Sequence, residues 1–233
     1  PLLGSIDTHI KVLNVLRHTV VLSQRAMDDE AMNDSEQEAR RKAWVAKQTE
    51  LDMCGAGKLC VDVIGATSVD SDELVIAAFE LSLALLEDGN EHVQATILDY
   101  LIEDHPNPDL FFGNLHHRLS RATKEEQDAI GQKHSQSRST LFSASMDGDG
   151  PDMEDLEVED MIRADLVFDF MQALCEGHNL RSQNVLRDQV SMIENSRKTH
   201  NLIQAALDYL LVSTSSSTVL RNLEEDSINK VGS

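Results

Sequence analysis

A glutamate and a histidine flank a glycine in the stretch LCEGHN, which runs from Leu174 to Asn179. An apolar helical pattern ends there and a polar one begins. Carboxylates are typical calcium ligands, and a neighbouring histidine can orient a carboxylate from outside the coordination sphere. Because calcium takes about six to eight oxygen ligands, Glu176 would supply part of a site, with His178 as an outer partner. The alternative is a purely structural role for Glu176 at a helix end.

The same pattern occurs earlier in the chain. Residues 85–98 and 174–187 align without a gap at an offset of 89 residues, which places Glu87 on Glu176 and Asn90 on Asn179. This offset is about twice the 40 to 47 residues of a HEAT or armadillo unit. Both stretches are therefore predicted to be helix–corner–helix units. In each, a small residue or the asparagine can adopt the left-handed conformation that ends a helix.

Composition predicts an all-α chain. Apolar residues make up 41% of the sequence and aromatic residues only 4%, so the core must be aliphatic, and no alternating strand pattern is present. The formal net charge of -21 would repel a phosphate backbone, which excludes nucleic acid as a partner. A cation or a basic protein segment is a more suitable partner for this negative charge. An acidic surface that serves only solubility would give the same composition. No apolar run approaches the roughly 18 residues of a membrane span.

Apolar periodicity and helix breakers predict helices over residues 5–24, 35–53, 56–66, 71–90, 90–104, 108–130, 159–179, 180–189, 196–214 and 216–228. Ser35 and Glu38 fit a capping box for the second of these helices, in which Trp44 should point inward. Gly55 and Gly57 are expected to end it. Short connections between successive helices favour antiparallel pairs, and the repeated corner favours an armadillo-like solenoid over a bundle.

Residues 131–155 differ from the rest, because serines and acids dominate and few apolar side chains are present. Such a segment cannot bury enough surface to form a packed core, so we predict a mobile acidic linker between solenoid parts at 1–130 and 156–233. An EF-hand beginning at Asp147 would place Pro151 at a ligand position and Val158 where a bidentate glutamate belongs. The acidic block is therefore not read as a calcium loop.

Catalytic motifs are missing from the sequence. The stretch CGAGKLC resembles a phosphate-binding loop, but Asp52 and Leu59 occupy positions that require glycine and serine or threonine. The adjacent His116 and His117 would point about 100° apart on a helix and cannot share one metal ion. Three cysteines without metal-ligand spacing indicate reduced thiols. We therefore predict a protein that is not an enzyme.

Three stretches resemble the intracellular calcium-release channels, the ryanodine and inositol trisphosphate receptors. They are FDFMQALCEGHNLRSQNVLRDQ, LALLEDGNEHVQATILDYL and NLIQAALDYLL, and CEGHN and LDYL are closer to the ryanodine branch. The resemblance spans roughly residues 38–211, without the acidic linker. It implies an armadillo-like core solenoid that links a cytosolic shell to the pore of a homotetrameric channel, on the cytosolic face of the endoplasmic or sarcoplasmic reticulum.

The resemblance also assigns roles within the corner. Glu176 would supply one carboxylate of the activating Ca²⁺ site, with His178 nearby. The second carboxylate would come from a later solenoid helix, and a backbone carbonyl from the domain that follows the pore. Because the chain begins at Pro1 and ends in NKVGS, we expect it to be a segment of a larger protein. An autonomous armadillo-like interaction scaffold without a calcium role is the second hypothesis.

Overall fold

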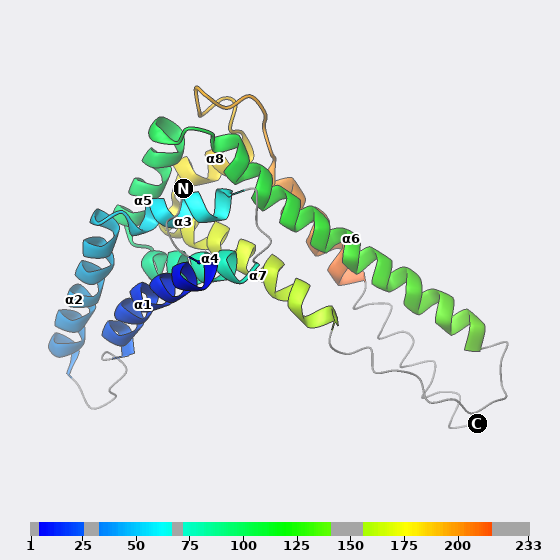
Figure 1. The fold of residues 1–233 in the computed structure, drawn as a ribbon, viewed down its shortest axis with the longest axis horizontal. Helices are drawn as coiled ribbons and strands as arrows, with labels where there is room; N and C mark the ends of the chain where they lie inside the picture. Colours follow the sequence, from blue (N-terminus) through cyan, green and yellow to red (C-terminus); the bar gives the residue numbers. More distant parts are fainter. Residues whose placement is uncertain (1–4, 26–32, 67–71, 141–155, 216–233) are drawn as a thin grey trace.

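The computed structural model describes residues 5–25, 33–66, 72–140 and 156–215, and the side chains of 5–24, 33–66, 73–132 and 164–215. Within these ranges the chain is helical and contains no strand, as predicted (Figure 1). The labelled elements are α1 (Ile6–Arg25), α2 (Asp34–Met53), α3 (Ala56–Gly65), α4 (Asp72–Leu86), α5 (Glu91–Asp99), the π-helical turn η1 (Tyr100–Asp104), α6 (Pro108–Thr140), α7 (Leu156–Cys175), the 3₁₀ turn η2 (Glu176–His178) and α8 (Leu180–Arg187). A further helix covers residues 202–215.

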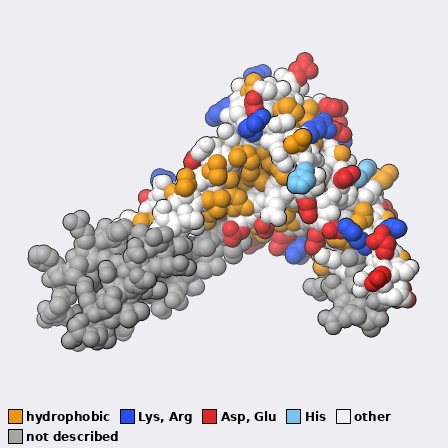
Figure 2. Space-filling model, turned by 180° about the vertical axis from the view of Figure 1, so that it is seen from behind, with side chains coloured by type: hydrophobic (Ala, Val, Ile, Leu, Met, Phe, Trp, Pro, Cys, Tyr) orange, Lys and Arg blue, Asp and Glu red, His pale blue; other side chains and the backbone are white. Residues whose placement is uncertain are grey.

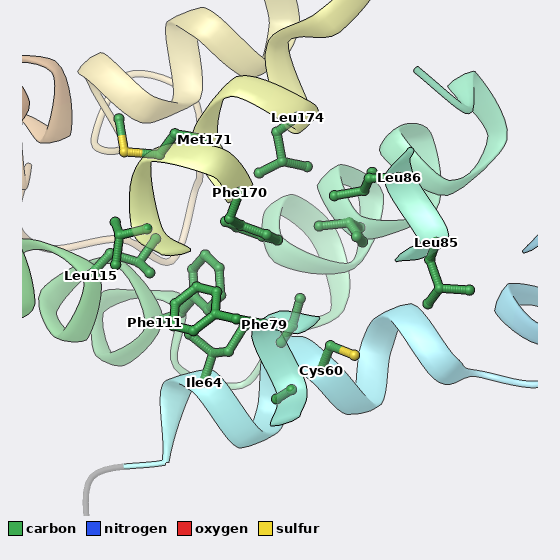
Figure 3. Close-up of a cluster of buried hydrophobic side chains, with 14 of the residues drawn as sticks. Cys60, Ile64, Phe79, Leu85, Leu86, Phe111, Leu115, Phe170, Met171 and Leu174 are labelled. Carbon is green, nitrogen blue, oxygen red and sulfur yellow. The ribbon is translucent and has the colours of Figure 1, made fainter. Parts of the chain in front are cut away.

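The core is centred on α4, whose sequence is apolar on nearly every side and which packs against α1, α3 and α7. Three aromatic rings from three different helices meet at its centre (Figure 3). The Phe170 ring lies edge-on to those of Phe79 and Phe111, with centroid distances of 5.7 and 6.1 Å. Aliphatic side chains such as Ile64 and Leu174 fill the space around them. The scarcity of aromatic residues is thus compatible with one well-placed aromatic cluster.

The start of α2 differs from the prediction. The N-cap is Asn33, whose side chain accepts the Glu36 amide while the Glu36 carboxylate accepts the Asn33 amide, forming a capping box. The predicted Ser35–Glu38 box was wrong, because asparagine caps a helix as well as serine does and stands two residues earlier. Trp44 is buried, which confirms its inward orientation.

The turn between α2 and α3 corrects a second expectation. Gly55 has a φ of 94° and lies directly before α3, in the turn that follows α2, but Gly57 lies inside α3. A Cβ on Gly57 would stand 2.5 Å from Oδ1 of the buried Asp52, so this glycine is needed for close approach and does not end α2. Burial raises the pKa of Asp52, and Thr96 and His92 lower it to a smaller extent.

The long helix α6 corrects the expected linker boundary. It continues through Thr140, so residues 131–140 are helical, whereas the rest of the expected linker, 141–155, lies outside the described residues. The physical reason is that extending a formed helix adds one hydrogen bond for each residue fixed. The sequence GQKHSQSRST contains no proline, and its single glycine costs only about 1 kcal/mol.

The C-terminal part of the described chain packs along α6 and α7. Tyr209, in the helix over 202–215, forms a small buried cluster with Ala122 of α6 and Ala164 of α7. The outer side of the same helix exposes Ile203, Leu207, Leu210 and Leu211. Hydrophobic side chains also gather on the face of the molecule shown in Figure 2. No helix in the described ranges has the length and hydropathy needed to cross a membrane.

Candidate functional site: two equivalent helix corners

The first corner joins α4 to α5. After Leu86 the backbone takes positive φ angles at Asp88 and Gly89, 63° and 66°. Asn90 then caps α5, because its side-chain oxygen accepts the amides of His92 at 3.1 Å and Val93 at 3.3 Å. The chain therefore reverses direction within a few residues, through a left-handed pair followed by an asparagine cap.

The second corner joins α7 to α8 in the same way. Gly177 and His178 have φ angles of 70° and 60°, and Asn179 caps α8 by accepting the Ser182 amide at 3.1 Å. The left-handed pair thus falls at the aligned positions of both corners, with the glycine second in one and first in the other. This confirms the predicted helix–corner–helix form. It corrects the expected role of the asparagines, which cap the following helices and are not left-handed.

A buried glutamine holds the first corner from α2. The Nε2 atom of Gln48 donates to the carbonyl oxygens of Ala84 at 3.0 Å and Glu87 at 3.1 Å. Its Oε1 atom accepts from Nδ2 of Asn90 at 2.9 Å. The last carbonyls of a helix lack hydrogen-bond partners inside the helix. The Gln48 side chain therefore supplies donors to the carbonyls at the end of α4 and also binds the residue that caps α5.

Gln94 repeats this arrangement at the second corner. Its Nε2 atom donates to the carbonyl oxygens of Ala173 at 2.8 Å and Glu176 at 3.2 Å, and its Oε1 atom accepts from Asn179 at 3.1 Å. Gln94 belongs to α5, so the second helix of one unit holds the corner of the next. We call this three-bond arrangement the glutamine clamp. The alignment of residues 85–98 with 174–187 places Gln94 on Gln183, but the sequence alone did not indicate the function of either side chain.

A basic side chain accompanies each clamp. Two residues after Asn90, the Nε2 atom of His92 lies 3.6 Å from Oδ2 of Asp52. Two residues after Asn179, Arg181 forms an ion pair with Asp99 at 2.5 Å. In both places the acidic partner lies on the same helix as the clamp glutamine. We call each contact between a clamp glutamine and the corner that it holds a joint. The two joints therefore share the clamp and the position of the basic residue.

Both corner glutamates line one cleft of about 970 Å³ between α1, α2, α4 and α7. The corners touch there, since a Cβ on Gly89 would lie 3.2 Å from Cγ of Glu176. The acids of the first corner have partners: Gln24 donates to Glu87 at 2.6 Å, and Arg41 pairs with Asp88 at 2.5 Å. Within the described residues the Glu176 carboxylate has no hydrogen-bond or ion-pair partner. The two aligned glutamates thus differ, because the Glu87 carboxylate has a hydrogen-bond partner and the Glu176 carboxylate has none within the described residues.

The predicted calcium ligand Glu176 and its predicted outer partner His178 lie together at the second corner. Glu176 and His178 belong to the same 3₁₀ turn, and both side chains are exposed. Among the described residues, no group of three or more histidine, cysteine, aspartate or glutamate side chains is arranged to hold a metal ion. The residues present therefore fit calcium only as one part of a site, and the other ligands would have to come from elsewhere.

Residues 159–231 match the family model described as RyR and IP3R Homology associated. This match supports the ryanodine and inositol trisphosphate receptor family. It includes α8 and the whole second corner, with Glu176 and His178. The first corner lies outside the matched residues, so its equivalence rests on the shared backbone angles and the shared glutamine clamp.

Proposed function

We propose that the chain is a cytosolic gating segment of a homotetrameric intracellular calcium-release channel, closer to the ryanodine receptor branch, at the endoplasmic or sarcoplasmic reticulum. The observation that carries the proposal is the carboxylate of Glu176, which has no partner within the described residues and lies at a corner inside the family match. The aligned Glu87 accepts from Gln24 instead. A structural repeat that leaves one of two equivalent carboxylates unpaired, on an exposed corner, is suited to ligand binding at that corner.

The proposed architecture is an armadillo-like solenoid. The glutamine clamps support it, because Gln94 joins one helix–corner–helix unit to the next with the same three hydrogen bonds by which Gln48 of α2 holds the first corner. Solenoids are built from such nearest-neighbour joints. The partners would be the remaining solenoid and the pore domains of the channel.

In this proposal Glu176 supplies one carboxylate to an activating Ca²⁺ ion, and His178 orients the ligands from outside the coordination sphere. The contact between the two corners indicates where a second acid would lie. Glu176 packs against Gly89, and His178 occupies the position aligned with Gly89. A corner glutamate of a following unit, stacked in the same way, would therefore lie against His178 and within reach of the same ion.

Gating would follow from the rigidity of these joints. Each clamp glutamine is buried, and its three hydrogen bonds fix the corner backbone to the helix beside it. A calcium ion bound at the second corner would then move neighbouring units as rigid bodies and shift the pore between two states. The ion could shift this equilibrium only by its difference in affinity for the two states. No catalytic step is involved.

The test is reconstitution of the parent protein in planar lipid bilayers, with cytosolic calcium varied. We expect a cation conductance whose open probability rises with calcium. The second hypothesis, an armadillo-like scaffold without a calcium role, predicts no conductance at any calcium concentration, and that result would overturn the channel proposal.

A further inference from the structure

The cleft between α1, α2, α4 and α7 is acidic. It has a volume of about 970 Å³, and α4, which packs against the other three helices, forms its floor. Among the described residues five carboxylates line it, and they are opposed by two guanidinium groups, those of Arg17 and Arg41. Partly buried aliphatic side chains lie among these charges, including those of Leu83 and Leu166. The cleft therefore fits a ligand that is cationic and partly apolar.

The contact between α1 and α4 shows how acids in this cleft are paired. Glu80 and Glu87 lie seven positions apart on α4, which is about 10 Å along a helix. Arg17 and Gln24 have the same spacing on α1, and their side chains donate to these two carboxylates at 2.9 and 2.6 Å. A helix with donors seven positions apart therefore matches the acids of α4.

The α7 side of the cleft carries the same pair of acids without donors. Asp169 and Glu176 fall on Glu80 and Glu87 at the 89-residue offset of the two corners, and both side chains are exposed. They line the cleft, but neither carboxylate has a hydrogen-bond or ion-pair partner within the described residues. Helix α7 therefore presents two carboxylates at the spacing that α1 satisfies on α4.

Trp44, the only tryptophan of the chain, indicates the kind of ligand. Its side chain lines the cleft and is 2% exposed, and its Nε1 atom has no hydrogen-bond acceptor among the described residues. A buried donor without an acceptor is unfavourable, so a group that enters the cleft with an oxygen acceptor would relieve it. A polypeptide carries such oxygens, whereas a metal ion or a polyamine carries none. The observations therefore favour a basic polypeptide over a small cation.

We propose that this cleft binds a basic amphipathic helix of a partner protein, whose two cationic side chains, seven positions apart, pair with Asp169 and Glu176. Apolar side chains between them pack on Leu83 and Leu166, and a polar side chain accepts the hydrogen of Trp44 Nε1. A second copy of this chain is a poor occupant, because 41 acidic against 20 basic residues give it a net charge of -21. The cleft lies between helices of the described chain, so its occupant does not extend the stack of units.

The experiment uses a capped peptide of about 15 residues, long enough to form a helix, with two arginines seven positions apart among alanine, leucine and glutamine. A control peptide has the same composition with the two arginines adjacent. Trp44 emission of the 233-residue chain is followed as each peptide is added. We expect a saturable change with the first peptide and about fivefold weaker binding of the second, because only one arginine can then reach an acid.

Two variants locate the binding. Asp169→Asn, at a residue with no part in the proposed calcium site, should weaken binding of the first peptide about fivefold. The matched control is Asp128→Asn on α6, which removes the same charge from an exposed position outside the cleft and should leave binding unchanged. Both side chains are exposed, so both variants should melt like the original chain. The comparison of the two peptides uses the original chain and needs no variant.

Four results would overturn the proposal. They are no saturable change in Trp44 emission, equal binding of the two peptides, equal effects of the two variants, and competition by spermidine as strong as that of the first peptide. Equal effects of the variants would indicate general attraction to an acidic chain, and strong competition by spermidine would assign the cleft to small polycations. Neither calcium nor conductance enters these measurements, so failure of this proposal can be distinguished from failure of the proposed channel function.

Discussion

The side-chain nitrogen of Gln94 lies 3.2 Å from the carbonyl oxygen of Glu176, a residue 82 positions further along the chain. The backbone of Glu176 is therefore fixed by the preceding unit, while its carboxylate stays without a partner in the described residues. The proposed gating role uses this combination, because a ligand bound to the carboxylate would act on a backbone that is tied to its neighbour.

Replacing Gln94 by glutamate tests the clamp. The variant keeps the shape of the side chain but leaves two partly buried carbonyls without a donor and places a charge beside them. We expect the free energy of unfolding of the 233-residue chain to fall by about 2 to 4 kcal/mol, measured by urea denaturation. The matched control is Gln183→Glu on the exposed face, which should change stability by less than about 0.5 kcal/mol. Equal effects of the two variants would contradict the clamp.

The two corner glycines should respond differently to alanine. Both Gly89 and Gly177 have positive φ angles, so a side chain at either costs about 1 to 2 kcal/mol. A Cβ on Gly89 would also press on Glu176 at 3.2 Å, whereas a Cβ on Gly177 has open space around it. Thermal unfolding should show that Gly89→Ala is the more destabilising substitution. The reverse order would mean that the corners do not touch as described.

Stability should depend on pH through Asp52. Burial raises the folded-state pKa of Asp52 above the ordinary value of 3.8, so the folded chain holds the proton more tightly than the unfolded chain. This contribution to stability is present at low pH and is lost as pH rises through the raised pKa. Asp52→Asn removes the titration. The difference in unfolding free energy between variant and original should therefore shift in favour of the variant as pH rises from about 4 to 7. A difference that does not change with pH would contradict this.

Calcium binding by the isolated chain should be weak. One free carboxylate is a poor calcium site, so titration calorimetry of the 233-residue chain should find no saturable site tighter than about the millimolar range. Diffuse binding to the acidic residues can still occur, and Glu176→Gln should leave it unchanged. A saturable micromolar site lost in Glu176→Gln would show that the chain carries a complete site by itself.

Sequence reasoning was most successful where a local pattern determines the structure. Apolar periodicity located most of the described helices, although the last of them begins at residue 202 and not at 196, and the predicted helix 216–228 lies outside the described residues. The 89-residue offset identified two equivalent corners, because each corner is built from its own few residues. It failed at the α2 cap, where two capping patterns compete within six residues. It also failed at α6, which continues through Thr140, because polar residues that cannot form a core can still extend a helix.

The glutamine clamp could not be predicted, because its partners are distant in sequence. The aligned Gln94 and Gln183 have the same local context, yet one is buried against the next corner and the other is exposed. The difference in their burial follows only from the way that one unit packs on the next. The same reason applies to Glu87 and Glu176, because the partner of Glu87 is Gln24 on α1, and neither corner's own sequence indicates this contact.

The most direct test of the account compares Glu87→Gln with Glu176→Gln in the proposed parent channel. Each substitution keeps the side-chain shape and removes one charge from an equivalent corner. Single-channel open probability is measured as a function of cytosolic calcium. We predict that Glu176→Gln moves the activation midpoint to higher calcium while conductance is retained, and that Glu87→Gln leaves the midpoint in place. An unshifted midpoint for Glu176→Gln, or equal shifts for the two variants, would contradict the assignment of Glu176 as a calcium ligand.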